Sequence, residues 1–193
     1  MEKQTLVFAT NNKHKLEELQ KAVGDSFIIK SLKEIGFTED IEEPFETLEE
    51  NAYAKSSFIN KKFGINCFAD DTGLEILALN GEPGVYSARY AGEQCSFEDN
   101  MNKVLKKMEN IKERKARFRT VISLILNGEE HQFTGIVNGV ILESRHGEEG
   151  FGYDPIFRPD GFKESFAQMP LAVKNKISHR GLAVKKLIEF LLK

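Results

Sequence analysis

Two adjacent carboxylates, Asp70 and Asp71, directly follow an apolar segment, and this arrangement constrains the fold more than any other part of the chain. Aspartate is depleted in β-strands, so a pair at this place indicates either a turn or a functional site. Because neighbouring strand residues point to opposite faces, only one of the two carboxylates is expected to face a given site. Thr72 and Gly73 predict a turn that exposes it. The alternative is that both aspartates only end the strand and accept hydrogen bonds from turn amides.

The chain is long enough to bury one core or two small lobes, since 40% of its 193 residues are hydrophobic and 30% are charged. We expect a single domain over residues 1–193. The net charge of −3 excludes a global basic field, so no nucleic-acid partner is expected. No apolar run approaches the length of a membrane span, and two cysteines are too few for a disulfide framework. These features predict a cytoplasmic protein without membrane partners.

Hydrophobic periodicity predicts alternating strands and helices in the first half of the chain and more antiparallel strands in the second. The first half is expected to contain strands at 4–10, 27–30 and 67–70, a further strand at 75–79 returning beside the last, a helix at 13–23, and a second helix between Thr47, which begins a capping box, and Gly64. The second half is expected to contain a helix after Ser96, a hairpin of strands 117–126 and 131–137 joined by Asn127-Gly128, a turn at Asn138-Gly139 into a strand at 140–143, and a last helix after Ser178.

Polar side chains cluster at the junction between the first predicted strand and the first predicted helix, at Thr10, Asn12, Lys13 and Lys15. Free amides and the dipole at a helix N-terminus attract anions, and the lysines add formal charge, so this junction suits phosphate. The sequence has no glycine-rich phosphate-binding loop there. The alternative is a polar cap on an exposed helix.

Carboxylates and a lysine surround the start of the second helix. Glu42 and Glu43 could supply the hard oxygen ligands that Mg²⁺ prefers, although acidic loops are usually only solvated. Asn51 and Lys55 lie four residues apart at the edge of the apolar face, where they could reach a cleft beside the core. The alternative is that both are exposed helix residues.

A loop rich in aromatic residues and glycine, Phe151-Gly152-Tyr153-Asp154, has a composition suited to a planar ligand stacked on a ring. It could equally pack into the core. Lys174, His179 and Arg180 then bring hydrogen-bond donors together before the last helix. With no second histidine at zinc-site spacing, His179 is not expected to bind a metal. No Ser or Cys lies in a nucleophile motif, so covalent catalysis is not expected.

Six motifs in one order cover nearly the whole chain. They are Ala9-Thr10-x-Asn12-x-x-Lys15, Glu50-Asn51-Ala52-x-Ala54-Lys55, Ala69-Asp70-Asp71-Thr72-Gly73-Leu74, Pro83-Gly84-Val85-Tyr86-Ser87-Ala88-Arg89-Tyr90, Gly150-Phe151-Gly152-Tyr153-Asp154-Pro155 and Ser178-His179-Arg180. In this order they resemble the inosine/xanthosine triphosphate pyrophosphatase (Ham1-like) family. The resemblance implies an α/β fold with an elongated, mixed and strongly twisted sheet flanked by helices, in two lobes with a central cleft. It also implies Mg²⁺-dependent hydrolysis of ITP, dITP or XTP to the monophosphate and pyrophosphate by a homodimer.

The resemblance also implies roles for individual residues. It assigns the triphosphate to Thr10, Asn12, Lys13, Lys15 and Lys55, the metal to Glu42 and Asp71 with Asp70 as a supporting contact, the general base to Asp71, a substrate contact to Thr72, and the base and ribose to Phe151, Gly152, Tyr153, Asp154, Lys174, His179 and Arg180. Donors from His179 and Arg180 would pair with the purine six-oxygen and face the amino group of adenine unfavourably.

Two other functions stay open at this point. One is a nucleotide-binding module without catalysis, against which the two aspartates argue, because carboxylates beside a triphosphate are useful only with a cation between them. The other is a pyrophosphatase for modified pyrimidine nucleotides on a related fold.

Overall fold

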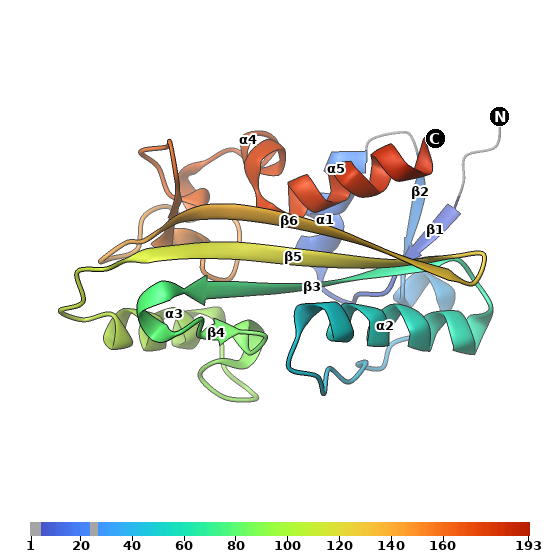
Figure 1. Cartoon of the computed structure of the whole chain (residues 1–193), viewed down its shortest axis with the longest axis horizontal. Coiled ribbons are helices and arrows are strands. Elements are labelled where there is room, and N and C mark those ends of the chain that lie inside the picture. Colours follow the sequence, from blue (N-terminus) through green and yellow to red (C-terminus); the bar gives the residue numbers. More distant parts are fainter. Residues whose placement is uncertain (1–4, 24–26) are drawn as a thin grey trace. The chain divides into compact units, whose positions relative to one another are not determined.

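The computed structural model describes residues 5–23 and 27–193 (Figure 1). Contacts divide the chain into two compact units. Unit 1 combines the chain up to Asp71 with residues 120–135 and 180–193, and unit 2 combines residues 72–119 and 136–179. The single domain expected for residues 1–193 stays a prediction. Within the described ranges, no helix is long and apolar enough to cross a membrane.

Unit 1 contains a mixed sheet in the order β2-β1-β3-β5-β6. Its strands and helices are β1 (Thr5–Phe8), α1 (Lys13–Val23), β2 (Ile28–Ser31), α2 (Leu48–Phe63), α5 (His179–Leu191, from Arg180 on), and the parts of β3 (Cys67–Ile76), β5 (Lys115–Leu126) and β6 (Glu129–Ile141) that belong to this unit. Strand β1 runs parallel to both β2 and β3. These elements confirm the predicted strand and helix order, with Gln4 of the first predicted strand outside the described residues.

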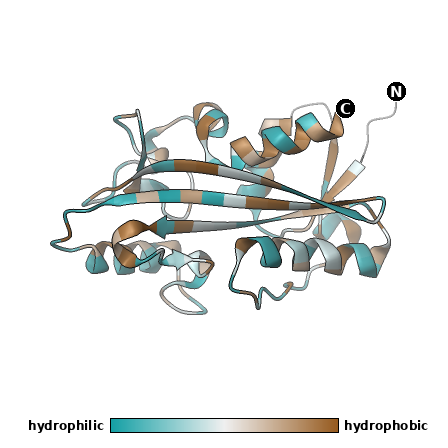
Figure 2. Ribbon diagram, in the orientation of Figure 1, coloured by the Kyte–Doolittle hydropathy of each residue, from teal (hydrophilic) through white to brown (hydrophobic). Residues whose placement is uncertain are grey.

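Helices cover both faces of the unit 1 sheet, with α2 on one face and α5 on the other (Figure 1). One buried cluster joins the strands to α1 and α5 through residues such as Phe8, Leu19 and Leu187, whereas a second joins the opposite face to Ile59 of α2. Both hydrophobic and hydrophilic residues colour α5 in Figure 2, as expected for a helix with one buried side. The rings of Phe8 and Phe68 stack at 4.7 Å, and these two residues are direct partners in the parallel pairing of β1 and β3.

Unit 2 contains the order β4-β3-β5-β6-β7. Its own elements are β4 (Pro83–Gly84), α3 (Phe97–Lys107), β7 (Phe157–Pro159), α4 (Leu171–Ile177) and the 3-10 helices Leu77–Leu79, Ser87–Arg89, Asp154–Ile156 and Phe166–Gln168. Strands β4 and β7 pair antiparallel with β3 and β6. Apolar side chains of α3, β3, β5 and the loops form the core of this unit. The α/β class and the mixed sheet flanked by helices are therefore confirmed.

Local signals in the sequence place several element ends correctly. Ser96 caps α3 in a full capping box with Asp99, and Gly64 ends α2 in the left-handed conformation. Thr47 accepts a hydrogen bond from the Glu50 amide, while the Glu50 carboxylate bonds the Thr47 hydroxyl.

The turn predicted at Thr72 and Gly73 is wrong, because β3 continues without interruption from Cys67 to Ile76. Gly73 is needed for a different reason: a Cβ there would lie 2.7 Å from the carbonyl oxygen of Gly84 on the neighbouring strand β4. The predicted strand 75–79 is also wrong. Its first two residues complete β3 and the others form the 3-10 helix Leu77–Leu79.

The two Asn-Gly pairs of the second half differ in structure. Asn127 and Gly128 both have positive φ and connect β5 to β6, as predicted. By contrast, Asn138-Gly139 lies inside β6, which continues to Ile141, so the predicted turn there is wrong. A Cβ on Gly139 would clash with the Arg158 backbone and the Phe157 ring of β7, which explains the glycine by close strand packing.

Candidate functional site

The two adjacent aspartates lie inside β3, and both are buried, with exposed fractions of 2% for Asp70 and 6% for Asp71. Their partners differ, as strand alternation predicts. Asp70 accepts hydrogen bonds from Lys15 Nζ at 2.8 Å and from Arg180 Nε at 3.2 Å. Asp71 Oδ1 lies 3.7 Å from Lys55 Nζ. The alternative in which the pair only ends a strand is therefore wrong, because each carboxylate is engaged by a cation in the middle of a strand.

Arg180 at the start of α5 lies buried between two carboxylates of unit 1. Its Nη1 bonds Glu18 of α1, while its Nε bonds Asp70 of β3. Glu18 is 5% exposed and was not predicted as a site residue. The available signal was its position beside Leu19 on the buried face of the predicted helix, three residues after Lys15. The role of Arg180 toward a purine base stays a prediction, and its described contacts tie α5 to α1 and β3.

Asp70 is held in its ionised form. Burial opposes ionisation, but Lys15, Arg180 and Lys55 outweigh it and hold the pKa of this carboxyl well below its usual range. Burial also lowers the pKa of Lys15, against the opposing effect of Asp70. A carboxylate bound to two cations is a poor proton acceptor, so Asp70 is suited to fixing Lys15 and Arg180 rather than to acid-base chemistry.

Asp71 has the opposite electrostatic character, although it is the next residue. Burial raises its pKa to about 6; Lys55 and Lys15 act against this rise, whereas Glu43 and Asp70 add to it. A carboxyl group with a pKa near neutrality can exchange a proton under physiological conditions. Of the two aspartates, Asp71 is therefore the one suited to be a general base.

Lys55 of α2 lies between two carboxylates, since its Nζ bonds Glu43 and lies 3.7 Å from Asp71. Burial alone would lower its pKa, but Asp71, Glu43 and Asp70 raise it above the ordinary value. Lys55 is 8% exposed and Asn51 0%, so the alternative that both are exposed helix residues is wrong. Glu43 is half-buried, whereas the neighbouring Glu42, predicted as a metal ligand, is exposed.

The junction between β1 and α1 is organised by Asn12. Its side-chain Oδ1 accepts hydrogen bonds from the backbone amides of His14 and Lys15 at 3.0 and 3.2 Å. The backbone amide of Asn12 donates to Thr10 Oγ1 at 3.2 Å. The helix-cap alternative thus describes Asn12 correctly. Lys13 is exposed and Lys15 is half-buried with its ammonium on Asp70. Contacts of Thr10, Asn12 and Lys13 with a triphosphate stay predictions.

Unit 2 contains the other predicted site residues, and three of them lie together. Lys174 Nζ bonds Asp154 Oδ2 at 2.6 Å, both side chains being buried, and lies 5.2 Å from the centre of the Phe151 ring. The Phe151 amide donates to the same Asp154 oxygen at 2.9 Å. Gly150 is required here by its positive φ of 78° and by its contact with the Asp154 carboxylate. This ion pair fixes the aromatic loop against α4.

Tyr153 and His179 lie inside the core of unit 2. Burial raises the pKa of the Tyr153 phenol, which donates to the Ser87 carbonyl at 2.7 Å, so the core-packing alternative is correct for this residue. The His179 ring stacks on Phe118 at 4.5 Å with an interplanar angle of 16°. Phe118 was not predicted, since a phenylalanine within an apolar strand has no distinctive pattern. Gly152 and Thr72 are half-buried, and their substrate contacts stay predictions.

The fold and unit 1 site define an α/β protein with a buried charged network, in which one aspartate is a fixed anion and its neighbour titrates near neutrality. Among residues 5–23 and 27–193, no group of three or more histidine, cysteine, aspartate or glutamate side chains is arranged to hold a metal ion. The chain belongs to the Ham1 family, whose family model matches residues 6–190.

Relatives and solved structures agree with this assignment. The chain is 55% identical to a dITP/XTP pyrophosphatase of Flavobacterium johnsoniae, over 96% of this chain and 97% of that protein. It is 50% identical to a dITP/XTP pyrophosphatase of Porphyromonas gingivalis, over 97% of each. The solved Ham1 protein of Staphylococcus aureus matches with a TM-score of 0.88 and 42% identity over 98% of both chains. A HAM1 protein from Coxiella burnetii matches with a TM-score of 0.90 and 36% identity over 98% of both.

Proposed function

We propose that this protein hydrolyses the triphosphates of deaminated purine nucleosides, ITP, dITP and XTP, to the monophosphate and pyrophosphate. Membership of the Ham1 family and relatives named dITP/XTP pyrophosphatase support the substrate class. The structural observation that carries the proposal is the pairing of Asp71, whose pKa is raised to about 6, with the buried ammonium group of Lys55. Such a pair places a proton acceptor beside a group that can neutralise phosphate charge.

The chemistry follows from the charge of the substrate. A triphosphate repels an attacking hydroxide, so hydrolysis requires cations on the phosphate oxygens and a base that takes the proton from water. Lys55 and Lys15 are the proposed cations, and Asp71 is the proposed base. Asp70 keeps Lys15 in place through the 2.8 Å bond between the two side chains. The two aspartates therefore divide positioning and proton transfer between them.

Mg²⁺ is the proposed cofactor. Proteins usually bind Mg²⁺ through one or two carboxylates together with substrate phosphates, and do not need a complete protein cage. The donors present fit such a site, because Glu43 and Asp71 converge on one cationic group, the ammonium of Lys55. Asp71 with Glu43 or Glu42 would hold the ion, and Asp70 would support it. When bound, Mg²⁺ supplies positive charge to the phosphate oxygens.

Base recognition is assigned to residues near the second charged pair and the last helix. Lys174 with Phe151 and Asp154 offers a cation, an aromatic face and a carboxylate, which suit the ribose and base. Donors from His179 and Arg180 are proposed for the purine six-oxygen, which adenine replaces with an amino group. A homodimer and a cytoplasmic location complete the proposal.

A substrate panel tests the proposal directly. Purified protein should release pyrophosphate rather than orthophosphate from ITP, dITP and XTP, much faster than from ATP, and EDTA should stop the reaction. Equal rates on ATP and GTP would refute the specificity. Tight ITP binding without turnover in Mg²⁺ would favour a nucleotide-binding module without catalysis. Faster turnover of modified pyrimidine triphosphates than of ITP would favour a pyrophosphatase for modified pyrimidine nucleotides.

A further inference from the structure

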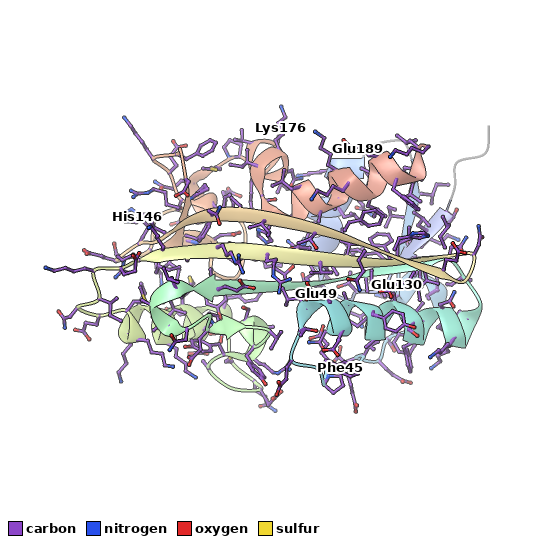
Figure 3. The ribbon with its side chains drawn as sticks, viewed as in Figure 1. Phe45, Glu49, Glu130, His146, Lys176 and Glu189 are labelled. Atoms are coloured by element: carbon purple, nitrogen blue, oxygen red, sulfur yellow. The ribbon has the colours of Figure 1, made fainter. Side chains whose placement is uncertain are left out.

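Residues 42–46 of the acidic segment before α2 bury no apolar side chain. Glu42, Pro44, Phe45 and Glu46 are exposed, and Glu43 is half-buried. Even the Phe45 side chain, at 44% exposure, is not part of the core, and Figure 3 places it on the loop that leads into α2. Ile41, just before Glu42, packs against the cluster of residues that includes Ile59 of α2, so an apolar contact holds the start of the segment and polar contacts must hold the rest.

Asn51 provides such contacts through both ends of its carboxamide. Its Nδ2 donates to the Phe45 carbonyl at 3.0 Å, and its Oδ1 accepts from the Phe45 amide at 3.0 Å. The Asn51 side chain is fully buried, with an exposed fraction of 0%. The carboxamide carries a donor and an acceptor on two separate atoms, whereas leucine has neither, ionised aspartate has no donor, and serine has a single shorter hydroxyl that cannot take the place of both atoms.

The two bonds fix the backbone close to the carboxylates. Phe45 is two residues after Glu43, which bonds Lys55 Nζ. Lys55 in turn lies one helical turn after Asn51 on the same face of α2. Helix α2 thus holds the acidic segment at its backbone through Asn51 and at a side chain through Lys55.

We propose that Asn51 is a positioning residue that holds the Glu42–Glu43 segment where its carboxylates can act with Asp71 on a divalent cation. This inference rests on the proposed function, because the cation is the one that the proposed hydrolysis uses. Loss of a group that orients metal-binding side chains typically weakens metal binding or activity by about 10- to 100-fold. Exposed side chains in the segment allow it to detach into water without unfolding α2.

The experiment compares wild-type protein with Asn51→Leu and a matched control, Asn60→Leu. Asn60 also lies on α2 and also donates to a backbone carbonyl, that of Ile65 at 2.9 Å, but at the opposite end of the helix. Three quantities are measured on each protein: amide hydrogen exchange of residues 42–46, Mn²⁺ binding followed by electron paramagnetic resonance without nucleotide, and the Mg²⁺ concentration for half-maximal pyrophosphate release from dITP. Asn51→Ser serves as a second variant if Asn51→Leu does not fold.

In Asn51→Leu, we expect exchange of the Phe45 amide to rise at least about tenfold, and Mn²⁺ affinity to fall by about 10- to 100-fold with a matching rise in the Mg²⁺ requirement. Asn60→Leu should leave all three unchanged. Faster exchange with unaltered Mn²⁺ affinity would overturn the positioning role, as would equal effects of both variants. Lack of dITP turnover by the wild type would refute the proposed function instead, while exchange and Mn²⁺ binding would still decide the role of Asn51.

Discussion

Replacement of Asp70 with asparagine is the most informative test of the buried charged network. The carboxylate is 2% exposed and accepts from Lys15 at 2.8 Å and from Arg180 at 3.2 Å. Asparagine has the same size, but it carries no charge and one of its two terminal groups is a donor that cannot accept from either cation. Asp70→Asn therefore leaves buried Arg180 and half-buried Lys15 without their shared anion.

Breaking a buried ion pair from one side destabilises a protein by about 3–5 kcal/mol. The lower end applies here, because Arg180 keeps its bond to Glu18 and the Lys15 side chain retains 15% exposure to water. At about 2–4 °C per kcal/mol for a chain of this length, the melting temperature should fall by about 6–12 °C. Calorimetry or urea unfolding at pH 7 measures the change, with Asp160→Asn on an exposed loop as a control that stays within about 0.5 kcal/mol.

The pH dependence of the stability difference between wild type and Asp70→Asn tests whether loss of the Asp70 charge causes it. The folded-state pKa of Asp70 is depressed below its unfolded value of about 3.9, so the stability it contributes is fully present above that value. It is lost as the pH falls through the folded-state pKa. The part of the stability difference between wild type and Asp70→Asn that comes from the Asp70 charge should thus be fully present at pH 7 and shrink below about pH 4. A loss below about 1 kcal/mol at pH 7, typical of an exposed pair, would refute the reasoning.

Three further predictions concern single residues. Asp71→Asn should lower kcat for dITP by about 10²- to 10⁴-fold, and an unchanged kcat would show that Asp71 is not the base. In the wild type, kcat/KM should fall about tenfold per pH unit below about pH 6, because the proposed base must be ionised. Gly139→Ala should destabilise the fold by about 1–3 kcal/mol in urea unfolding, since its Cβ would meet the Arg158 backbone, and an unaltered midpoint would contradict this close packing. Burial raises the pKa of the Cys67 thiol to about 12, so a thiol reagent should modify Cys95 first and Cys67 only after denaturation. Equal rates of modification of the two thiols in the folded protein would show that Cys67 is accessible.

Features that depend on a few neighbouring residues were predictable from the sequence. The cap at Ser96, the end of α2 at Gly64 and the turn at Asn127-Gly128 all follow from local backbone chemistry. Turn-like residues at Thr72-Gly73 and Asn138-Gly139 misled the prediction because those glycines serve close approach to a neighbouring strand, β4 at Gly84 and β7 at Arg158. Local composition carries no record of such an approach.

In the candidate site, too, local features were predictable from the sequence, whereas contacts between distant residues were not. Strand alternation correctly predicted that Asp70 and Asp71 would have different partners. The bond between Arg180 and Glu18 joins residues 162 positions apart, and so no pattern within one helix could reveal it. The sequence predicted both Lys55 and the acidic loop as parts of the site, but the bond of Lys55 to Glu43 depends on the path of the loop, which no local pattern reveals.

The stacked pair Phe8 and Phe68 has a consequence for how mutations in this family can accumulate. These rings fix the register of β3 against β1 two residues before the first aspartate. Insertion of one residue between Phe68 and Asp70 would turn every later side chain of the strand to the other face. Asp70 would then occupy the position of Asp71, Asp71 would occupy that of Thr72, and the position that faces Lys15 would hold no carboxylate, although the amino-acid composition hardly changes. The spacing between Phe68 and the two aspartates is therefore as important to the charged network as the identity of the carboxylates.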